Sequence, residues 1–188
     1  DASTAPLPTT IYFNCVPYHG LKDRQFVLRL GVLTSAKDPA IVLRIDSPGG
    51  SALASEQIWR AIRRARERKP VIASLGAVAA SGGYYIASAA DEIWADPATL
   101  TGSIGIYYGK VDFQELAETV GVNVEILGRG RRSGATSLFR PFTDDERQRL
   151  QEMIASMYQL FLTRVAEGRG MTVEEVDALG QGRIWSGD

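Results

Sequence analysis

The residue with the clearest chemical potential is Ser81, which stands in the run AASGG at positions 79–83. Its neighbours are all small, so its hydroxyl group should be exposed at the start of a helix, at the positive end of the helix dipole. The N–H group of Gly82 could then donate to a developing oxyanion, and Gly50, in the turn SPGG at 47–50, could supply a second donor. This pattern predicts nucleophilic catalysis. The same small residues would also let a helix pack closely on a sheet, and local composition leaves both interpretations open.

The segments around these residues alternate between strand and helix patterns. Apolar and β-branched runs predict strands over 10–16, 41–46, 70–75, 91–96, 104–108, 122–127 and 182–186. Helical spacing predicts helices after Asp23, over 52–68, 84–90 and 112–120, and after the capping boxes at 143–146 and 172–175. Such alternation is typical of βαβ units with a mostly parallel sheet. Sites in these sheets form at the carboxyl ends of the strands, where we expect the loops 47–51, 76–83 and 99–103.

The composition excludes several classes of protein. With 188 residues, of which 45% are apolar and 23% charged, the chain resembles an ordinary globular α/β protein. Its net charge of −1 disfavours nucleic acid as the main partner. The single Cys15 excludes an internal disulfide and a cysteine-based zinc site, and the single His19 leaves few ways to build a histidine-rich one.

The two ends of the sequence bear on how the chain is organised. No apolar run is long enough to span a membrane, and residues 1–8 lack the pattern of an export signal. We expect residues 1–20 to form an extended lead-in with the first strand and residues 21–188 to form one domain. The missing initial Met, and an end just after an apparent strand, indicate a fragment of a longer protein.

Three ordered motifs extend the argument beyond Ser81: IVLRIDSPGGS at 41–51, AASGGYYIAS at 79–88 and TLTGSIG at 99–105. Together they closely resemble the signal peptide peptidase A (protease IV) family. The resemblance implies a Clp-protease/crotonase-like α/β superfold and a serine peptidase with a Ser/Lys dyad, without metal or organic cofactor. It assigns the nucleophile to Ser81, oxyanion donors to Gly82 and Gly50, and to Ser103 a hydrogen bond with the lysine. Substrate contacts are expected from the residues Gly49, Ile104 and Tyr107.

The general base that the resemblance calls for has no obvious place in this sequence. Single-domain members carry a lysine after the strand that ends here near 127, but residues 128–137 contain none, and Ser133 takes its position. Arginine cannot replace it, because a guanidinium does not lose its proton at usable pH. The four lysines of the chain are Lys22, Lys37, Lys69 and Lys110.

The two later lysines are poorly placed to act as the base. Lys69 precedes the strand whose far end carries Ser81, and Lys110 follows Ser103 by about 20 Å of apparent strand. In double-length members of the family the lysine lies in the N-terminal half and the serine in the C-terminal half. This chain resembles the C-terminal half, so we expect a companion domain or subunit to supply the lysine.

Other interpretations stay open. His19 could complete a Ser-His-Asp triad. The arginines within 60–68 and 129–132 predict a solvated surface or a contact with anionic lipid or a companion subunit. Tyr107 and Tyr108 could line a groove for an extended peptide, or could equally take part in core or interface packing. The chain could be a non-catalytic subunit of such an assembly, or an acyl-CoA enzyme of the same superfold that stabilises a thioester enolate with backbone amides.

The resemblance also gives the expected biological setting. It implies a membrane-associated endopeptidase that cleaves remnant signal peptides and other hydrophobic, unfolded segments at the outer face of a bacterial or thylakoid-type membrane. Members of the family form homo-oligomeric rings or domes. Small apolar side chains around Ser81 favour an apolar residue before the cleaved bond.

Overall fold

A computed structural model describes residues 9–14 and 39–188 of the chain. The helix predicted after Asp23 lies outside these ranges, as do His19, Lys22 and Lys37. The triad involving His19 therefore stays a prediction. We describe the remaining elements below.

The central sheet is built from short β-branched segments, and all but one of its pairings are parallel. Its strands are β1 (Thr9–Asn14), β2 (Ile41–Ser47), β3 (Val71–Ala80), β4 (Glu92–Trp94), β5 (Leu100–Gly102) and β6 (Ile184–Trp185). The order is β1-β2-β3-β5-β6, with β4 also paired to β3 and with β6 antiparallel to β5. The predicted parallel α/β sheet is confirmed.

Side-chain caps start three of the helices in the described residues, those that follow Ser51, Thr143 and Thr172. The helices are α2 (Ala52–Arg66), α3 (Gly82–Ala87), α4 (Gln114–Thr119), α5 (Asp144–Arg169) and α6 (Val173–Leu179). Both predicted capping boxes form, because Thr143 and Glu146 exchange hydrogen bonds, as do Thr172 and Glu175. The first turn of each of these two helices is thereby satisfied within the sequence itself.

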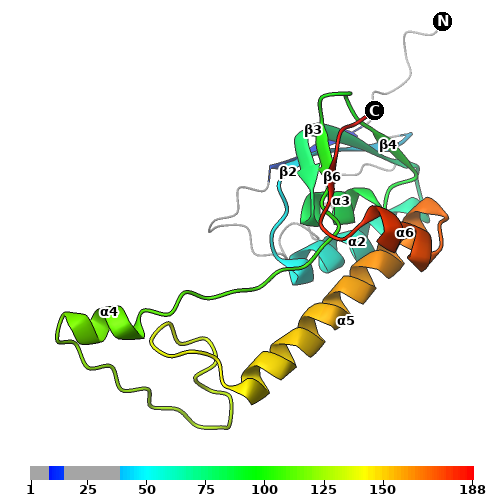
Figure 1. Ribbon diagram of the computed structural model, residues 1–188. Coiled ribbons are helices and arrows are strands. Elements are labelled where there is room, and N and C mark those ends of the chain that lie inside the picture. The colour runs from blue at the N-terminus through cyan, green and yellow to red at the C-terminus, as the bar shows by residue number, and fades with distance from the viewer. Residues whose placement is uncertain (1–8, 15–38) are drawn as a thin grey trace, which may run out of the picture. The chain divides into compact units, whose positions relative to one another are not determined.

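The core lies on one face of the sheet, between the sheet and the helices α2 and α3 (Figure 1). Alternate residues of β2 and β3 point into it, and Leu43, Ile45 and Ala73 are completely buried. Helices contribute Ile58, Ile62, Tyr85, Ile86, Phe161 and Val165. Each large apolar side chain buried here stabilises the fold by about 1.5–3 kcal/mol relative to leaving it in water.

The described residues fall into two compact units. The catalytic-motif unit, as we name it, comprises the described residues up to Gly105 together with Gln159–Asp188; the second unit comprises Ile106–Tyr158. In the second unit only Ala117 and Glu146 are buried. The assignment of residues 21–188 to a single domain stays a prediction.

Four predictions about individual strands were wrong. Residues 100–102, expected within a loop over 99–103, form β5, which pairs with β3 and β6. Residues 76–80, expected in a loop, continue β3, because they pair with β2 and β5. Residues 104–108 and 122–127, expected as strands, form none. Within the described part of the chain, the only backbone hydrogen bond from 122–127 joins the Val122 N–H to the Ala117 carbonyl, so the second segment has no strand to pair with.

Candidate active site

Ser81 occupies a sharp turn between β3 and α3. Its backbone angles are φ 50° and ψ −119°, a region that residues with a side chain rarely adopt. Hydrogen bonds hold this conformation from both sides: the Ser81 N–H donates to the Gly102 carbonyl at 2.9 Å, and the Ser81 carbonyl accepts from the Tyr85 N–H at 2.8 Å. The hydroxyl group does not cap α3. Strain of this kind, held by surrounding structure, is common where a nucleophile must project from a strand-to-helix turn.

The turn at the end of β2 packs directly against Ser81. Gly49 (φ 105°) approaches so closely that an added Cβ atom would lie 2.7 Å from both the Ser81 Cβ and the Gly82 nitrogen. The Gly49 N–H donates to the Ser47 Oγ at 3.1 Å, which fixes the turn. A side chain at position 49 is therefore excluded by sterics and by backbone conformation.

The residues Gly50 and Gly82 lie next to each other at this contact. An added Cβ atom on Gly82 would lie 3.3 Å from the Gly50 nitrogen. The Gly82 N–H is the first of α3 and has no acceptor within the helix. The structure thus brings together the two residues predicted as oxyanion donors, although their role in catalysis stays a prediction.

Ser103 emerges beside Ser81 because β3 and β5 are parallel and in register. Ala80 is paired with Gly102, so the two serines follow paired residues at the same edge of the sheet. Ser103 also has a positive φ, of 49°, and its N–H donates to the Arg183 carbonyl at 2.7 Å. The β5 segment is fastened to β3 by Thr101, whose Oγ1 donates to the Ala79 carbonyl at 2.8 Å. The carboxyl ends of β3 and β5 therefore lie close together, as expected for neighbouring parallel strands.

The other expected substrate-binding residues have different surroundings. The Ile104 side chain is 5% exposed, so a substrate contact from this residue would involve its backbone, whose carbonyl already accepts from the Gly182 N–H. Tyr107 is 95% exposed and belongs to the second unit. Their roles stay predictions.

The two lysines of the described part have different surroundings. Lys69 lies two residues before β3, whose ten residues span about 33 Å, so it is at the opposite edge of the sheet from Ser81, as predicted. Lys110 does not follow a strand, so that part of the expectation was wrong. Its Nζ donates to the carbonyls of Ala135 and Ser137 at 3.1 and 2.7 Å and lies 4.2 Å from the centre of the Phe142 ring.

Ser133, which the resemblance puts in the position of the family lysine, is an exposed residue of the second unit. Its Oγ donates to the Gly130 carbonyl at 2.9 Å. This hydrogen bond closes a local turn. It gives Ser133 no neighbouring group that would help it accept the proton of Ser81.

Sequence reasoning missed the bulge in β3 that precedes Ser81. Ile45 pairs with Leu75, but Ser47 pairs with Ala79, so β3 uses two more residues than β2 here. Asp46 fills the gap, and its Oδ1 accepts from the Val78 N–H at 3.2 Å. The available signal was Gly76, where an added Cβ atom would lie 2.7 Å from the Asp46 side chain.

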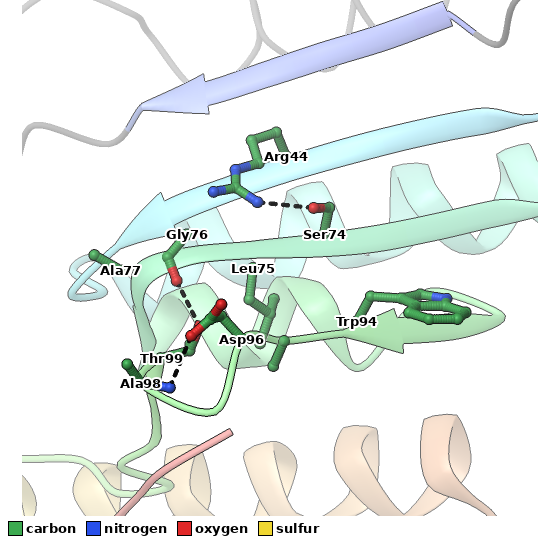
Figure 2. A pocket seen from close by; sticks show the side chains of 10 residues that line it. Arg44, Ser74, Leu75, Gly76, Ala77, Trp94, Asp96, Ala98 and Thr99 are labelled. Atoms are coloured by element: carbon green, nitrogen blue, oxygen red, sulfur yellow. Dashed lines mark hydrogen bonds between the residues drawn. The ribbon is translucent and has the colours of Figure 1, made fainter. Parts of the chain in front are cut away.

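A hollow of about 560 Å³ lies beside the middle of β2 and β3 and the segment that follows β4 (Figure 2). Arg44 and Ser74 line it and share a hydrogen bond of 2.8 Å, with Trp94 and Asp96 further along the rim. Neither Ser81 nor Gly82 lines this hollow. The hollow is therefore separate from the residues proposed for catalysis.

Two further searches concerned metal and membrane. Within residues 9–14 and 39–188, no group of three or more His, Cys, Asp or Glu side chains is arranged to hold a metal ion. Among the helices of these same ranges, none combines the length and the apolar character that crossing a membrane requires.

Comparison with known proteins assigns the family. The sequence model for Peptidase family S49 matches residues 63–188. This chain belongs to Peptidase family S49. Within the family, it is 44% identical over 159 residues to the chloroplastic serine protease SPPA of Arabidopsis thaliana, a match that covers 83% of this chain and 23% of that protein. It is 42% identical to Protease 4 of Haemophilus influenzae, covering 79% of this chain and 24% of that protein.

These matches confirm the predicted family resemblance and show that the chain spans about a quarter of the length of these two relatives. A solved structure supports the fold independently. A ClpP1 mutant from Listeria monocytogenes matches with a TM-score of 0.53 at 17% identity, covering 86% of this chain and 72% of that one. The predicted Clp-protease fold is therefore confirmed for this member of the family.

Proposed function

We propose that this chain is the nucleophile-bearing half of a serine endopeptidase. The observation that carries the proposal is the strained turn at Ser81, held by backbone hydrogen bonds and packed against the Gly49 turn. The turn brings Ser81 next to the two glycines proposed as oxyanion donors, Gly82 and Gly50. Membership of a peptidase family supports the same assignment.

The proposed reaction is acyl transfer through a serine ester. The Ser81 Oγ attacks the peptide carbonyl carbon while its proton passes to a neutral lysine amine. The tetrahedral oxyanion accepts hydrogen bonds from the Gly82 and Gly50 N–H groups, and one such donor is worth about 10²–10³ in rate. The lysine then gives its proton to the leaving nitrogen as the C–N bond breaks. Water attacks the ester, its proton passes through the lysine to Ser81, and the carboxyl product leaves.

The lysine is proposed to come from outside this chain. Ser103 stands beside Ser81 at the same edge of the sheet and would orient the lysine by a hydrogen bond. Lys69 is at the opposite edge, and Lys110 is held by two carbonyls of the second unit. A companion domain or a neighbouring subunit would complete the dyad.

The second unit supports association with further copies of the chain. Residues 122–126 alternate apolar and polar side chains like a strand, yet the apolar residues Val122, Val124 and Ile126 are 50%, 43% and 38% exposed. Pairing with a strand of another copy would satisfy this segment. The acidic residues Asp112, Glu115, Glu118 and Glu125 form no ion pair within the described part, while residues 129–132 are rich in arginine. Arg131 and Arg132 pair with Asp145 within the chain, so Arg129 is the arginine of this segment proposed to meet these acidic residues in another copy.

The proposed substrates are remnant signal peptides and other hydrophobic, unfolded segments, cleaved at the outer face of a bacterial or thylakoid-type membrane. The small side chains around Ser81 favour an apolar residue before the cleaved bond. A peptide library tests this preference, and selection of charged residues at that position would contradict it.

Labelling with a serine-reactive fluorophosphonate tests the function. We expect the longest natural form of the protein to be labelled at Ser81, and the Ser81→Ala variant to be unlabelled. The matched control is Ser133→Ala, which removes an exposed hydroxyl of the second unit and should label like the parent. The isolated chain should label weakly or not at all.

The outcomes separate the alternatives. Full labelling of the isolated chain, lost in Ser81→Ala, would show that a base lies within these 188 residues and would contradict the external lysine. No labelling of the longest form would contradict the peptidase and favour a non-catalytic subunit. The confinement of Lys110 and the position of Lys69 are the observations that keep this second candidate in view.

A further inference from the structure

A buried carboxylate, Glu56, lies at the centre of a hydrogen-bonded cluster behind the proposed active site. Its Oε2 accepts from the Tyr85 hydroxyl at 2.6 Å and from the Arg164 Nε at 3.1 Å. Its Oε1 accepts from the Arg164 Nη2 at 2.8 Å and from the Arg60 Nε at 2.5 Å. The residue is 7% exposed. Glu56 thus joins three helices: α2, α3 and α5.

The cluster keeps Glu56 charged. Burial alone would raise the pKa of Glu56, but hydrogen bonds from Arg164, Tyr85 and Arg60 outweigh burial and hold that pKa below its usual value. The Arg164 guanidinium also lies 4.4 Å from the centre of the Trp59 ring, which restricts its motion. A buried carboxylate with this many donors is a rigid anchor, because moving any partner leaves a buried charge incompletely paired.

Tyr85 connects this anchor to the proposed nucleophile. Its hydroxyl donates to Glu56, and its backbone N–H donates to the Ser81 carbonyl at 2.8 Å. The ring is 3% exposed and lies 4.6 Å, centre to centre, from the Phe161 ring. Tyr85 therefore links the Glu56 cluster to Ser81 through two hydrogen bonds, one from its hydroxyl and one from its backbone N–H.

A second contact acts on the proposed oxyanion donor. Ser55 precedes Glu56 on α2, and an added Cβ atom on Gly82 would lie 2.5 Å from its Oγ. That Oγ donates to the Ser51 carbonyl at 3.0 Å, so Ser55 is itself fixed. The helix that holds Glu56 thus also forms the wall behind Gly82.

We propose that Glu56 and Tyr85 are positioning residues for Ser81 and Gly82. This inference rests on the proposed function, in which Ser81 is the nucleophile. The Tyr85–Glu56 hydrogen bond fixes the position of α3 relative to α2. In this position the Ser81 turn keeps its strained backbone angles, and the Gly82 N–H can donate to the oxyanion. Misplacement of a reacting group by about 1 Å is sufficient to slow a reaction by up to about 10²-fold.

The sharpest variant is Tyr85→Phe, tested in the longest natural form of the protein. It removes one hydroxyl and keeps the buried ring, so the protein should remain folded. At a temperature well below unfolding, we expect the maximal fluorophosphonate labelling rate to fall about tenfold, with the inhibitor concentration for half-maximal rate unchanged. A loss of folded protein would instead lower the amplitude of labelling.

The matched control is Asp91→Asn, which breaks a different ion pair of the same helix. The Asp91 carboxylate accepts from Arg66 at 2.8 Å, near the end of α2, and from the Val71 N–H at 2.8 Å. This variant should lose stability while its labelling rate stays at the parental value. Equal slowing in Asp91→Asn and Tyr85→Phe would overturn the proposal, as would a parental rate in Tyr85→Phe.

Coupling and hydrogen exchange complete the test. Glu56→Gln combined with Tyr85→Phe should slow labelling no more than the slower single variant, because both act through one hydrogen bond; additive effects would overturn the proposal. Tyr85→Phe should also speed amide exchange in residues 80–86 selectively. Absence of labelling in the parent would contradict the proposed function, whereas unchanged exchange in 80–86 would contradict the positioning role.

Discussion

The two units of this protein contain similar strand sequences with opposite outcomes. In the catalytic-motif unit, β2 has neighbours on both sides, and its residues Leu43 and Ile45 are completely buried. In the second unit, residues 122–126 alternate apolar and polar side chains but pair with no strand within the described chain, and Val122 is 50% exposed. The comparison shows that alternation marks a segment able to form a strand, whereas a partner backbone decides whether the strand forms.

The largest expected effect comes from the closest contact of the catalytic-motif unit. Gly49→Ala would place a Cβ atom 2.7 Å from the Ser81 Cβ and the Gly82 nitrogen, in a backbone region unfavourable for alanine. We expect fluorophosphonate labelling to fall by about 10²-fold or more, because the turn must withdraw from the proposed oxyanion donors. Parental labelling in Gly49→Ala would show that this contact is dispensable.

Packing in the two units can be compared at one glycine of each, Gly168 in the catalytic-motif unit and Gly109 in the second unit. An added Cβ atom on Gly168 would lie 1.9 Å from the Ser88 carbonyl oxygen, whereas one on Gly109 meets nothing within 4 Å. We expect Gly168→Ala to lower the free energy of unfolding by about 1–3 kcal/mol. Gly109→Ala should change it by no more than about 0.5 kcal/mol. Denaturant unfolding measures both, and similar losses would contradict the contrast in packing.

A substitution in residues 122–127 should affect self-association without affecting folding. Val124 is 43% exposed, so Val124→Asp should leave the free energy of unfolding of the chain within about 0.5 kcal/mol of the parent. If this segment pairs with another copy, the variant should weaken self-association at least about tenfold, since a buried unpaired charge is costly. Sedimentation measures the association. Asn123→Asp adds the same charge one residue away, on the polar face, and an equal effect there would contradict burial of the apolar face.

Lowering the pH should destabilise the start of α5 through protonation of Glu146. This is the smallest of the four effects predicted here. Hydrogen bonds from Arg140 and from the Thr143 backbone lower the pKa of Glu146 from 4.5 to about 2. Because the pKa is lower in the folded state, the carboxylate stabilises the start of α5 above pH 4.5, and this contribution is lost as the pH falls toward 2. Helix content followed by circular dichroism should decline over this range. In Glu146→Gln this part of the decline should be absent, and an unchanged profile would contradict the assignment.

Features that depend on local chemistry could be predicted from the sequence. The capping boxes at Thr143 and Thr172 involve residues three positions apart, and both form. The convergence of Ser81, Gly49 and Ser103 could be predicted as well, because parallel strands bring their carboxyl ends to one edge. These predictions required only the pattern of elements and the general geometry of such sheets.

Features that depend on distant partners could not be predicted. The Glu56 cluster joins residues 29 and 108 positions apart, and each of them alone resembles an ordinary helix residue. The extension of β3 through 76–80 depends on Asp46 of another strand. The helix pattern of α2 revealed its apolar face but not which charged residue would be buried.

The bulge in β3 has a consequence for how this gene could tolerate insertions and deletions. Between the pairs Ile45–Leu75 and Ser47–Ala79, β3 advances four residues while β2 advances two. Since successive strand residues face opposite sides, this surplus of two preserves parity: Leu75 and Ala79 both point into the core. Loss of one codon here would invert the facing of every residue up to Ser81. Loss of two would restore the facing but draw the serine back along the sheet by about 7 Å, away from the glycine turn.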